Sequence, residues 1–270
     1  MCQLAQGYTT KAMGSGFAAS GGAVSALMAE KGLTGINEPL AGEWGLYNLY
    51  QRGGYIPEYL TGELGKYFMV EDDSIKPYPC CRCNHPFIDA TLALIMENDI
   101  KPQDVEEVIT HVGPHSYPIV CEPEEIKKNP HNSVAAQFSL PWSLATAITY
   151  RKVEVGHFSE EAVKDEKIRQ LARKVVMQVD QELTRQETIE PAVVEIRTGE
   201  GAYSKRVEHA LGSPQNPLSM EEVAMKFRSC ASYAARPISG EKLDQVVQMV
   251  TGLEDVTDVG QLIRLLGGER

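Results

Sequence analysis

The segment from Ile75 to His85, IKPYPCCRCNH, places a lysine, an arginine, three cysteines and a histidine within eleven residues that also hold two prolines. Cysteine and histidine are zinc ligands, so a zinc-binding module is one interpretation. The C-C-x-C spacing of Cys80, Cys81 and Cys83 is not a usual zinc pattern, because the side chains of adjacent residues diverge. We expect no metal and no redox dithiol here, and small thiols packed at the start of a helix instead.

Four basic residues lie next to glycine, proline or the start of a predicted helix: Lys11, Lys76, Arg82 and His85. Each one alone is typical of a solvated side chain. Together they predict a carboxylate-binding pocket, because lysine, arginine and helix N-termini are the groups that hold such anions. The segment GSGFAA (residues 14–19) matches the dinucleotide fingerprint, but no β-strand precedes it and no parallel βαβ unit surrounds it, so we expect no nucleotide site.

The composition limits the classes of function. The chain has 270 residues, a formal net charge of −11, 43% apolar residues and 23% charged residues. This acidic balance argues against electrostatic binding of nucleic acid, and no apolar run reaches the roughly 20 residues that a membrane span needs. Six unevenly spaced cysteines in a chain of this length favour reduced thiols over a disulfide framework. We therefore expect a cytoplasmic globular protein.

The elements that must position these residues follow from hydrophobic periodicity. In the middle of the chain we expect helices over Pro86–Glu97, about 133–150 and about 159–175, and strands over Val105–Val112, Lys174–Asp180, Ala192–Thr198 and Ala202–His209. The GEG between the last two strands predicts a hairpin. Helices interleaved with a few strands indicate an α+β unit.

The two ends of the chain have helical patterns. Residues 17–31 form one predicted helix that ends at Gly32, and a short helix is predicted around Trp44–Tyr50. Four glycines in and before the first helix would allow close helix approach, which predicts that this helix is buried. Ser219 and Glu222 form a capping box that starts a C-terminal helix, and two further apolar stripes follow it. The fold class expected is mainly α: a helical part built from both chain ends, with an α+β part inserted.

Four segments, in this order and spacing, resemble successive parts of the MmgE/PrpD family. They are TTKAMGSGFAASGGAVSALMAEKGLTG, IKPYPCCRCNHPFIDATLAL, AAQFSLPWSLATAI and GSPQNPLSMEEVAMKF. The family includes 2-methylcitrate dehydratase, cis-aconitate decarboxylase and iminodisuccinate epimerase. The resemblance covers nearly the whole chain.

The resemblance implies a fold, a reaction class and a set of site residues. It implies an all-helical domain from residues 1–74 and 211–270, an α+β lid over residues 75–210, and usually a homodimer. Such enzymes act on small di- or tricarboxylates without metal or organic cofactor, in a pocket between the two domains. Fixed cations there stabilise the charge that develops on the carboxylate. By resemblance Lys11, after Thr10, is the active-site lysine of the helical domain, and Lys76 is the lysine that opens the lid.

The sequence also departs from the family. Cys81 stands where decarboxylase-like members have a catalytic histidine, although His85 matches a second histidine one helical turn later. Trp142 replaces a frequent tyrosine and cannot act as a phenolic acid or base. We expect Lys11, Lys76 and His85 to be catalytic, and Thr10, Cys81, Arg82 and Trp142 to contact substrate, in the arrangement that the resemblance implies.

Met1 aligns inside the family's helical domain, so the chain resembles the C-terminal portion of such an enzyme. We expect a lyase or isomerase completed by a separately encoded N-terminal chain, or a homo-oligomer. The alternatives are a non-catalytic carboxylate-binding or scaffold subunit, and an inactive truncated remnant.

Overall fold

The structure is a computed structural model that describes residues 10–52, 54–184 and 189–267. The described residues divide after Asp73 into two compact units. The first extends from Thr10 to Asp73 and the second begins at Ser74.

The first unit is helical. It contains α1 (Thr10–Glu30), α2 (Leu46–Gln51), α3 (Glu58–Thr61) and a 3₁₀ turn over Met69–Asp72. The end of α1 agrees with the prediction: Gly32 has φ of +92°, and the backbone N–H of Leu33 donates to the carbonyl of Met28 at 3.1 Å. A glycine in the left-handed conformation is the usual end of a helix because it has no Cβ to clash.

The prediction that α1 is buried is wrong for the described residues. Phe17 is 65% exposed and Leu27 is 62% exposed. A Cβ added to any of the four glycines would meet nothing within 4 Å; these are Gly14, Gly16, Gly21 and Gly22. Small residues permit a close helix contact, but burial also requires a packing partner, and sequence periodicity does not supply one.

A four-stranded mixed sheet forms the centre of the second unit, with the strand order β2-β1-β3-β4 among the described residues. Its strands are β1 (Val105–Val112), β2 (Val175–Val179), β3 (Ala192–Thr198) and β4 (Gly201–Val207). β1 is parallel to β2 and antiparallel to β3, and β3 and β4 are antiparallel. The four strands and the hairpin predicted at GEG are confirmed, with Thr198 paired to Gly201.

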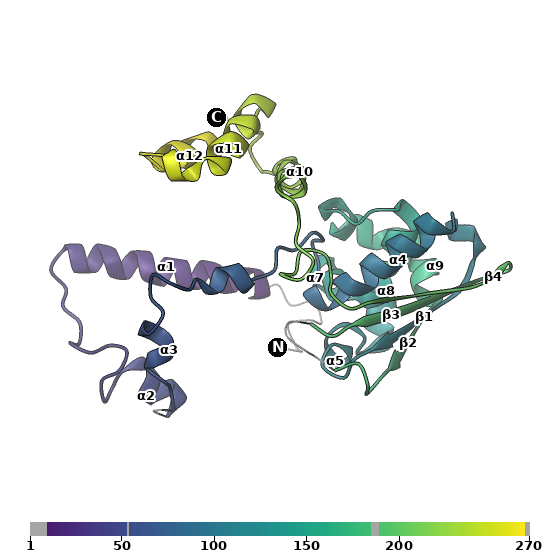
Figure 1. Cartoon of the computed structure of the whole chain (residues 1–270), viewed down its shortest axis with the longest axis horizontal. Coiled ribbons are helices and arrows are strands. Elements are labelled where there is room, and N and C mark those ends of the chain that lie inside the picture. The colour runs from purple at the N-terminus through teal and green to yellow at the C-terminus, as the bar shows by residue number, and fades with distance from the viewer. Residues whose placement is uncertain (1–9, 53, 185–188, 268–270) are drawn as a thin grey trace. The chain divides into compact units, whose positions relative to one another are not determined.

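Helices pack on this sheet or on one another. They are α4 (His85–Glu97), α5 (Tyr117–Val120), α6 (Glu124–Lys128), α7 (Ser133–Gln137), α8 (Leu140–Tyr150) and α9 (Glu166–Arg173). Short 3₁₀ turns occur at Arg82–Asn84, Pro102–Asp104, Val155–Phe158 and Ala162–Lys164. α4 lies against β3 and β4, and α8 packs between α4 and α9 (Figure 1). The buried side chains of these helices and strands form the hydrophobic core.

Two of the predicted helices have different bounds in the structure. The helix expected over residues 133–150 is interrupted, because the Ser139 hydroxyl accepts a hydrogen bond from the backbone N–H of Trp142 at 3.0 Å and caps a new helix, α8. The helix expected from residue 159 begins at Glu166, where Asp165 caps it by accepting from the N–H of Lys167 at 2.9 Å. It ends before Val175, which starts β2.

The C-terminal part of the second unit is helical. It contains α10 (Met220–Ala231), α11 (Gly240–Thr251), a 3₁₀ turn over Leu253–Asp255, and α12 (Gly260–Leu266). The predicted capping box is confirmed, since Ser219 and Glu222 bond to each other's backbone N–H. No helix among the described residues is long and apolar enough to cross a membrane. A mainly helical fold with an α+β part is confirmed, whereas a helical domain built from both chain ends stays a prediction.

Candidate functional site

The cluster of chemically active residues lies in a tight turn that leads into α4. The 3₁₀ turn Arg82–Asn84 follows Cys81, and His85 is the first residue of the helix. Pro86 is compatible with the first turn because its missing N–H has no partner there in any helix. The turn is fixed to the rest of the second unit, because the N–H of Cys81 donates to the carbonyl of Gln137 at 2.8 Å.

The Arg82 guanidinium connects the turn to the distant segment before α10. Its Nη1 donates to the Leu211 carbonyl at 2.9 Å, its Nη2 lies 3.4 Å from the Ala210 carbonyl, and Nη1 also lies 3.1 Å from His85 Nδ1. Arginine is only a donor, so Nδ1 must be the acceptor. In the neutral imidazole the proton therefore lies on Nε2.

His85 is kept neutral by its surroundings. Its side chain is fully buried, and burial lowers its pKa to about 3, with further lowering by the positive charges of Arg82, Lys76 and Lys226. Desolvation penalises the imidazolium, and each nearby cation adds to that penalty. At neutral pH this histidine is a hydrogen-bond donor through Nε2.

Three neighbouring side chains have buried polar atoms without a hydrogen-bond partner among the described residues. These atoms are Arg82 Nε, Asn84 Oδ1 and His85 Nε2. Leaving such a group unpaired costs about 1–3 kcal/mol, so each one calls for an explanation. Two of the three are donors, Arg82 Nε and His85 Nε2, which suits a ligand with acceptor oxygens.

A second hydrogen-bonded group supports Arg82 and His85. The Tyr78 hydroxyl donates to Asp89 Oδ1 at 2.7 Å, and the N–H of Leu211 donates to Asp89 Oδ2 at 2.7 Å. The Tyr78 and His85 rings are 5.1 Å apart. Burial raises the pKa of Asp89, and burial together with the Asp89 carboxylate raises the pKa of Tyr78. Asp89 and Arg82 thus hold the N–H and the carbonyl of the same residue, Leu211.

Trp142, predicted to contact substrate, lies in the core of the second unit. Its side chain is fully buried, and its indole Nε1 donates to the carbonyl of His157 at 3.1 Å. The next residue, Ser143, accepts a hydrogen bond from Asn84 Nδ2 at 3.0 Å. The helix that carries Trp142 is therefore bonded to the turn that carries Asn84, and the contact of Trp142 with substrate stays a prediction.

The structure brings together some of the predicted site residues. Cys81, Arg82 and His85 share one turn, and Lys76 donates to the Cys80 carbonyl at 3.3 Å beside it. Thr10 and Lys11 belong to α1 in the first unit; Thr10 is exposed, and the Lys11 side chain lies outside the described residues. Their roles stay predictions.

Sequence reasoning missed three residues that surround His85 or influence its pKa: Tyr78, Asp89 and Lys226. Lys226 lies in α10, inside the segment GSPQNPLSMEEVAMKF that carried part of the family resemblance, so its position was a usable signal. Tyr78 and Asp89 had no signal beyond their closeness to Arg82 in the sequence. They were missed because the partner segment, around Leu211, is distant along the chain.

The cysteines of the turn differ in burial. Cys80 and Cys83 are buried in the core, as predicted for packed thiols, and Cys81 is half-buried. Among the residues that the structure describes, no three histidine, cysteine, aspartate or glutamate side chains are grouped as metal ligands.

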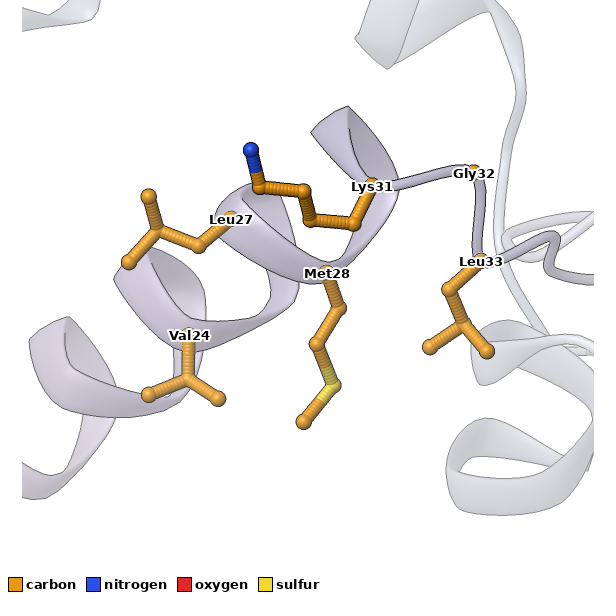
Figure 2. A pocket seen from close by; sticks show the side chains of 6 residues that line it. All are labelled: Val24, Leu27, Met28, Lys31, Gly32 and Leu33. Carbon is orange, nitrogen blue, oxygen red and sulfur yellow. The ribbon is translucent and has the colours of Figure 1, made fainter.

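The first unit has a hollow of its own. Figure 2 shows apolar side chains along the last turns of α1 and the residues that follow it. It is lined by Val24, Leu27, Met28, Lys31, Gly32 and Leu33. None of the predicted site residues is among them, so this hollow does not identify the candidate site.

Comparison with known proteins gives a family and several relatives. Residues 78–251 match the family model described as the MmgE/PrpD C-terminal domain. The chain is 26% identical to the cis-aconitate decarboxylase-like protein oryM of Aspergillus oryzae, covering 94% of this chain and 54% of that protein. It is 24% identical to cis-aconitate decarboxylase of Homo sapiens, covering 96% of this chain and 53% of that enzyme. The chain spans about half the length of the curated relatives it matches.

Proposed function

Because the chain belongs to the MmgE/PrpD family, we propose that it is part of a lyase or isomerase that acts on a small di- or tricarboxylate. The observation that carries this proposal is the group of buried, unpartnered polar atoms at Arg82, Asn84 and His85, two of them donors. Relatives named as cis-aconitate decarboxylases support the carboxylate class.

The proposed chemistry follows from the protonation state of His85. A neutral imidazole with its proton on Nε2 can donate to a carboxylate oxygen, and the Arg82 guanidinium adds positive charge beside it. As charge moves onto that carboxylate during proton removal or loss of CO2, fixed donors become more stabilising than in the ground state. In this proposal His85 and Lys76 are the catalytic groups of the second unit, and Arg82 contacts the substrate beside them.

Access to His85 requires a local rearrangement, because its side chain is fully buried. Arg82 contacts both His85 and the Leu211 carbonyl, so movement of the segment around Leu211 would change the surroundings of His85. We propose that substrate binding replaces part of these contacts. The pairing of Asp89 with Tyr78 and Leu211 would then set how easily that segment moves.

We further propose that activity needs a second chain and that residues 75–210 act as a lid on a helical domain formed with residues 1–74 and 211–270. Support comes from the exposed apolar side chains of α1, including Phe17 and Leu27. In this arrangement Lys11 and Thr10 would reach the carboxylate from α1, Cys81 would contact the substrate, and no cofactor would take part.

A reconstitution assay tests the proposed function. The chain is mixed with an N-terminal MmgE/PrpD-type chain, and loss of each member of a panel of di- and tricarboxylates is followed by proton NMR. We expect turnover in the mixture and none with either chain alone. Full activity of the isolated chain would refute the need for a partner, and no turnover of any carboxylate by a stable complex would refute catalysis.

A non-catalytic carboxylate-binding or scaffold subunit is the second candidate. Trp142 and Cys81 favour it, because an indole cannot act as the phenolic acid or base that relatives have there by resemblance, and Cys81 replaces a histidine. Calorimetry with citrate distinguishes the two candidates when it is combined with the turnover assay. Binding that is lost in Lys76→Ala, without turnover in a complex, would support the binding subunit.

A further inference from the structure

Lys127 is a charged residue inside the second unit that takes no part in the proposed chemistry. It belongs to the short helix α6, and its side chain is fully buried. Burial removes the hydration of an ammonium group, which is costly unless hydrogen bonds replace it. A methionine would fill a similar volume without that cost. The reason for a lysine here must therefore lie in the bonds that it makes.

The Lys127 ammonium joins two separate segments of the chain. Its Nζ donates to the carbonyl of Ile119, in α5, at 2.9 Å and to the carbonyl of Phe138, between α7 and α8, at 2.9 Å. The carbonyl of Lys127 also accepts from the Ser139 hydroxyl at 2.5 Å. Phe138 and Ser139 form the junction between α7 and α8, so Lys127 binds this junction through both its side chain and its main chain.

The same junction carries the turn of the candidate site. The N–H of Cys81 donates to the carbonyl of Gln137 at 2.8 Å, and Asn84 Nδ2 donates to the carbonyl of Ser139 at 3.3 Å. The turn thus binds the carbonyls on both sides of Phe138, and the ammonium binds the carbonyl of Phe138 itself. Because the three carbonyls belong to successive residues, a shift of the middle one would displace the acceptors of the turn.

We propose that Lys127 is a positioning residue, which holds the α7–α8 junction so that the turn from Cys81 to His85 keeps one arrangement. An ammonium suits this role because its three donors can bind carbonyls from two segments at once. Without it, the carbonyls of Ile119 and Phe138 lose a donor, which favours local opening of the junction. The description of this turn as catalytic rests on the proposed function, whereas the contacts of Lys127 do not.

Amide hydrogen exchange of the full chain, followed residue by residue by NMR, tests the proposal. In Lys127→Met the N–H of Cys81 should exchange at least about 10-fold faster than in the parent, because its acceptor lies in the loosened junction. The amides of the central strand β1 should change much less. A general loss of stability would instead accelerate the exchange at Cys81 and in β1 by the same factor, and that result would overturn the proposal.

Lys128 provides the matched control on the same helix. Its ammonium pairs with Glu124 at 2.7 Å and its side chain is half-buried, so Lys128→Met removes a charge from α6 and leaves the junction bonded. The Cys81 N–H should exchange at the parent rate in this variant. An acceleration as large as that in Lys127→Met would show that any charge on α6 has the effect, and the assignment to Lys127 would be wrong.

Lys127→Gln is the second variant at the same position. Its amide keeps two N–H donors on a shorter side chain, so the Cys81 exchange rate should lie between those of the parent and Lys127→Met. It also takes the place of Lys127→Met in the comparison with β1 if that variant does not fold. If neither variant folds, Lys127 supports the whole core rather than the turn, and the proposal fails.

Turnover separates this inference from the proposed function. In an active reconstituted complex, Lys127→Met should lower kcat at least about 10-fold, because a displaced turn misplaces the groups that contact substrate. Lys128→Met should leave kcat unchanged. An unchanged kcat in Lys127→Met would overturn the positioning role. A parent complex without any turnover would refute the proposed function instead, and the exchange rates would still decide whether Lys127 holds the turn.

Discussion

The buried His85 should make the stability of the second unit depend on pH in a defined direction. Burial and neighbouring cations lower its pKa from 6.5 to about 3, so the folded unit holds the imidazole neutral where the unfolded chain protonates it. A lowered pKa stabilises the fold fully above the unfolded value of 6.5, and this contribution is lost as pH falls toward 3. One pKa unit corresponds to about 1.4 kcal/mol, so the loss between pH 8 and pH 5 is about 2 kcal/mol.

The assay is urea unfolding followed by the fluorescence of Trp142, in a Trp44→Phe background. The chain has two tryptophans, and Trp142 is fully buried whereas Trp44 is 72% exposed, so the remaining signal reports on the second unit. We expect the free energy of unfolding to fall by about 2 kcal/mol more in the parent than in His85→Gln between pH 8 and pH 5. The glutamine can still accept a hydrogen bond from Arg82.

Two controls separate this effect from general acid destabilisation. Carboxylates contribute equally to the parent and to His85→Gln, so they cancel in the difference. The exposed His131 provides the matched substitution, and His131→Gln should keep the full pH dependence of the parent. If the parent and His85→Gln lose the same stability between pH 8 and pH 5, His85 is not held neutral and the account of its surroundings is wrong.

Three further substitutions test contacts around the turn by the same urea assay. Gly212→Ala should destabilise the second unit by more than about 2 kcal/mol, because Gly212 has φ of +80° and a Cβ there would lie 1.9 Å from the carbonyl oxygen of Ile75; a change below 0.5 kcal/mol would contradict it. Trp142→Phe should cost about 1–3 kcal/mol, because it leaves the His157 carbonyl without its indole donor. Its urea unfolding is followed by far-ultraviolet circular dichroism, since this variant lacks the tryptophan that reports on the second unit, and an unchanged midpoint would show that this bond is not needed. Asp89→Asn should cost about 1–3 kcal/mol, since it weakens two hydrogen bonds to a half-buried carboxylate. An unchanged free energy of unfolding would show that these two bonds do not stabilise the second unit.

Local patterns in the sequence were enough to predict much of the fold. The strand over Val105–Val112 was found because β-branched residues dominate it, and the β3–β4 hairpin because glycines flank Glu200. The cap at Ser219 was found because the capping box has a fixed spacing. These features depend on residues that are neighbours in the chain.

Features that depend on distant partners could not be predicted. Asp89 and Leu211 are 122 residues apart, and nothing in their local sequence indicates their hydrogen bond. For the same reason the burial of α1 could not be predicted: its small residues permit a close helix contact, but they do not indicate whether a partner helix is present. In the candidate site, Arg82 and His85 were found by type and spacing, while the protonation state of His85 could be inferred only from its burial and neighbouring charges.

The central claim is that His85, beside Arg82, acts on a carboxylate substrate. The most direct test is consumption of cis-aconitate and related tricarboxylates, followed by proton NMR, in the complex reconstituted with an N-terminal chain. The parent and His85→Gln are compared at equal concentration, after co-elution has shown that both form the complex. We expect turnover by the parent and at least a 100-fold loss in His85→Gln, in line with the roughly 10²–10⁴-fold contribution of a positioned proton-transfer or donor group. Equal turnover by the two proteins would contradict the assignment of this site.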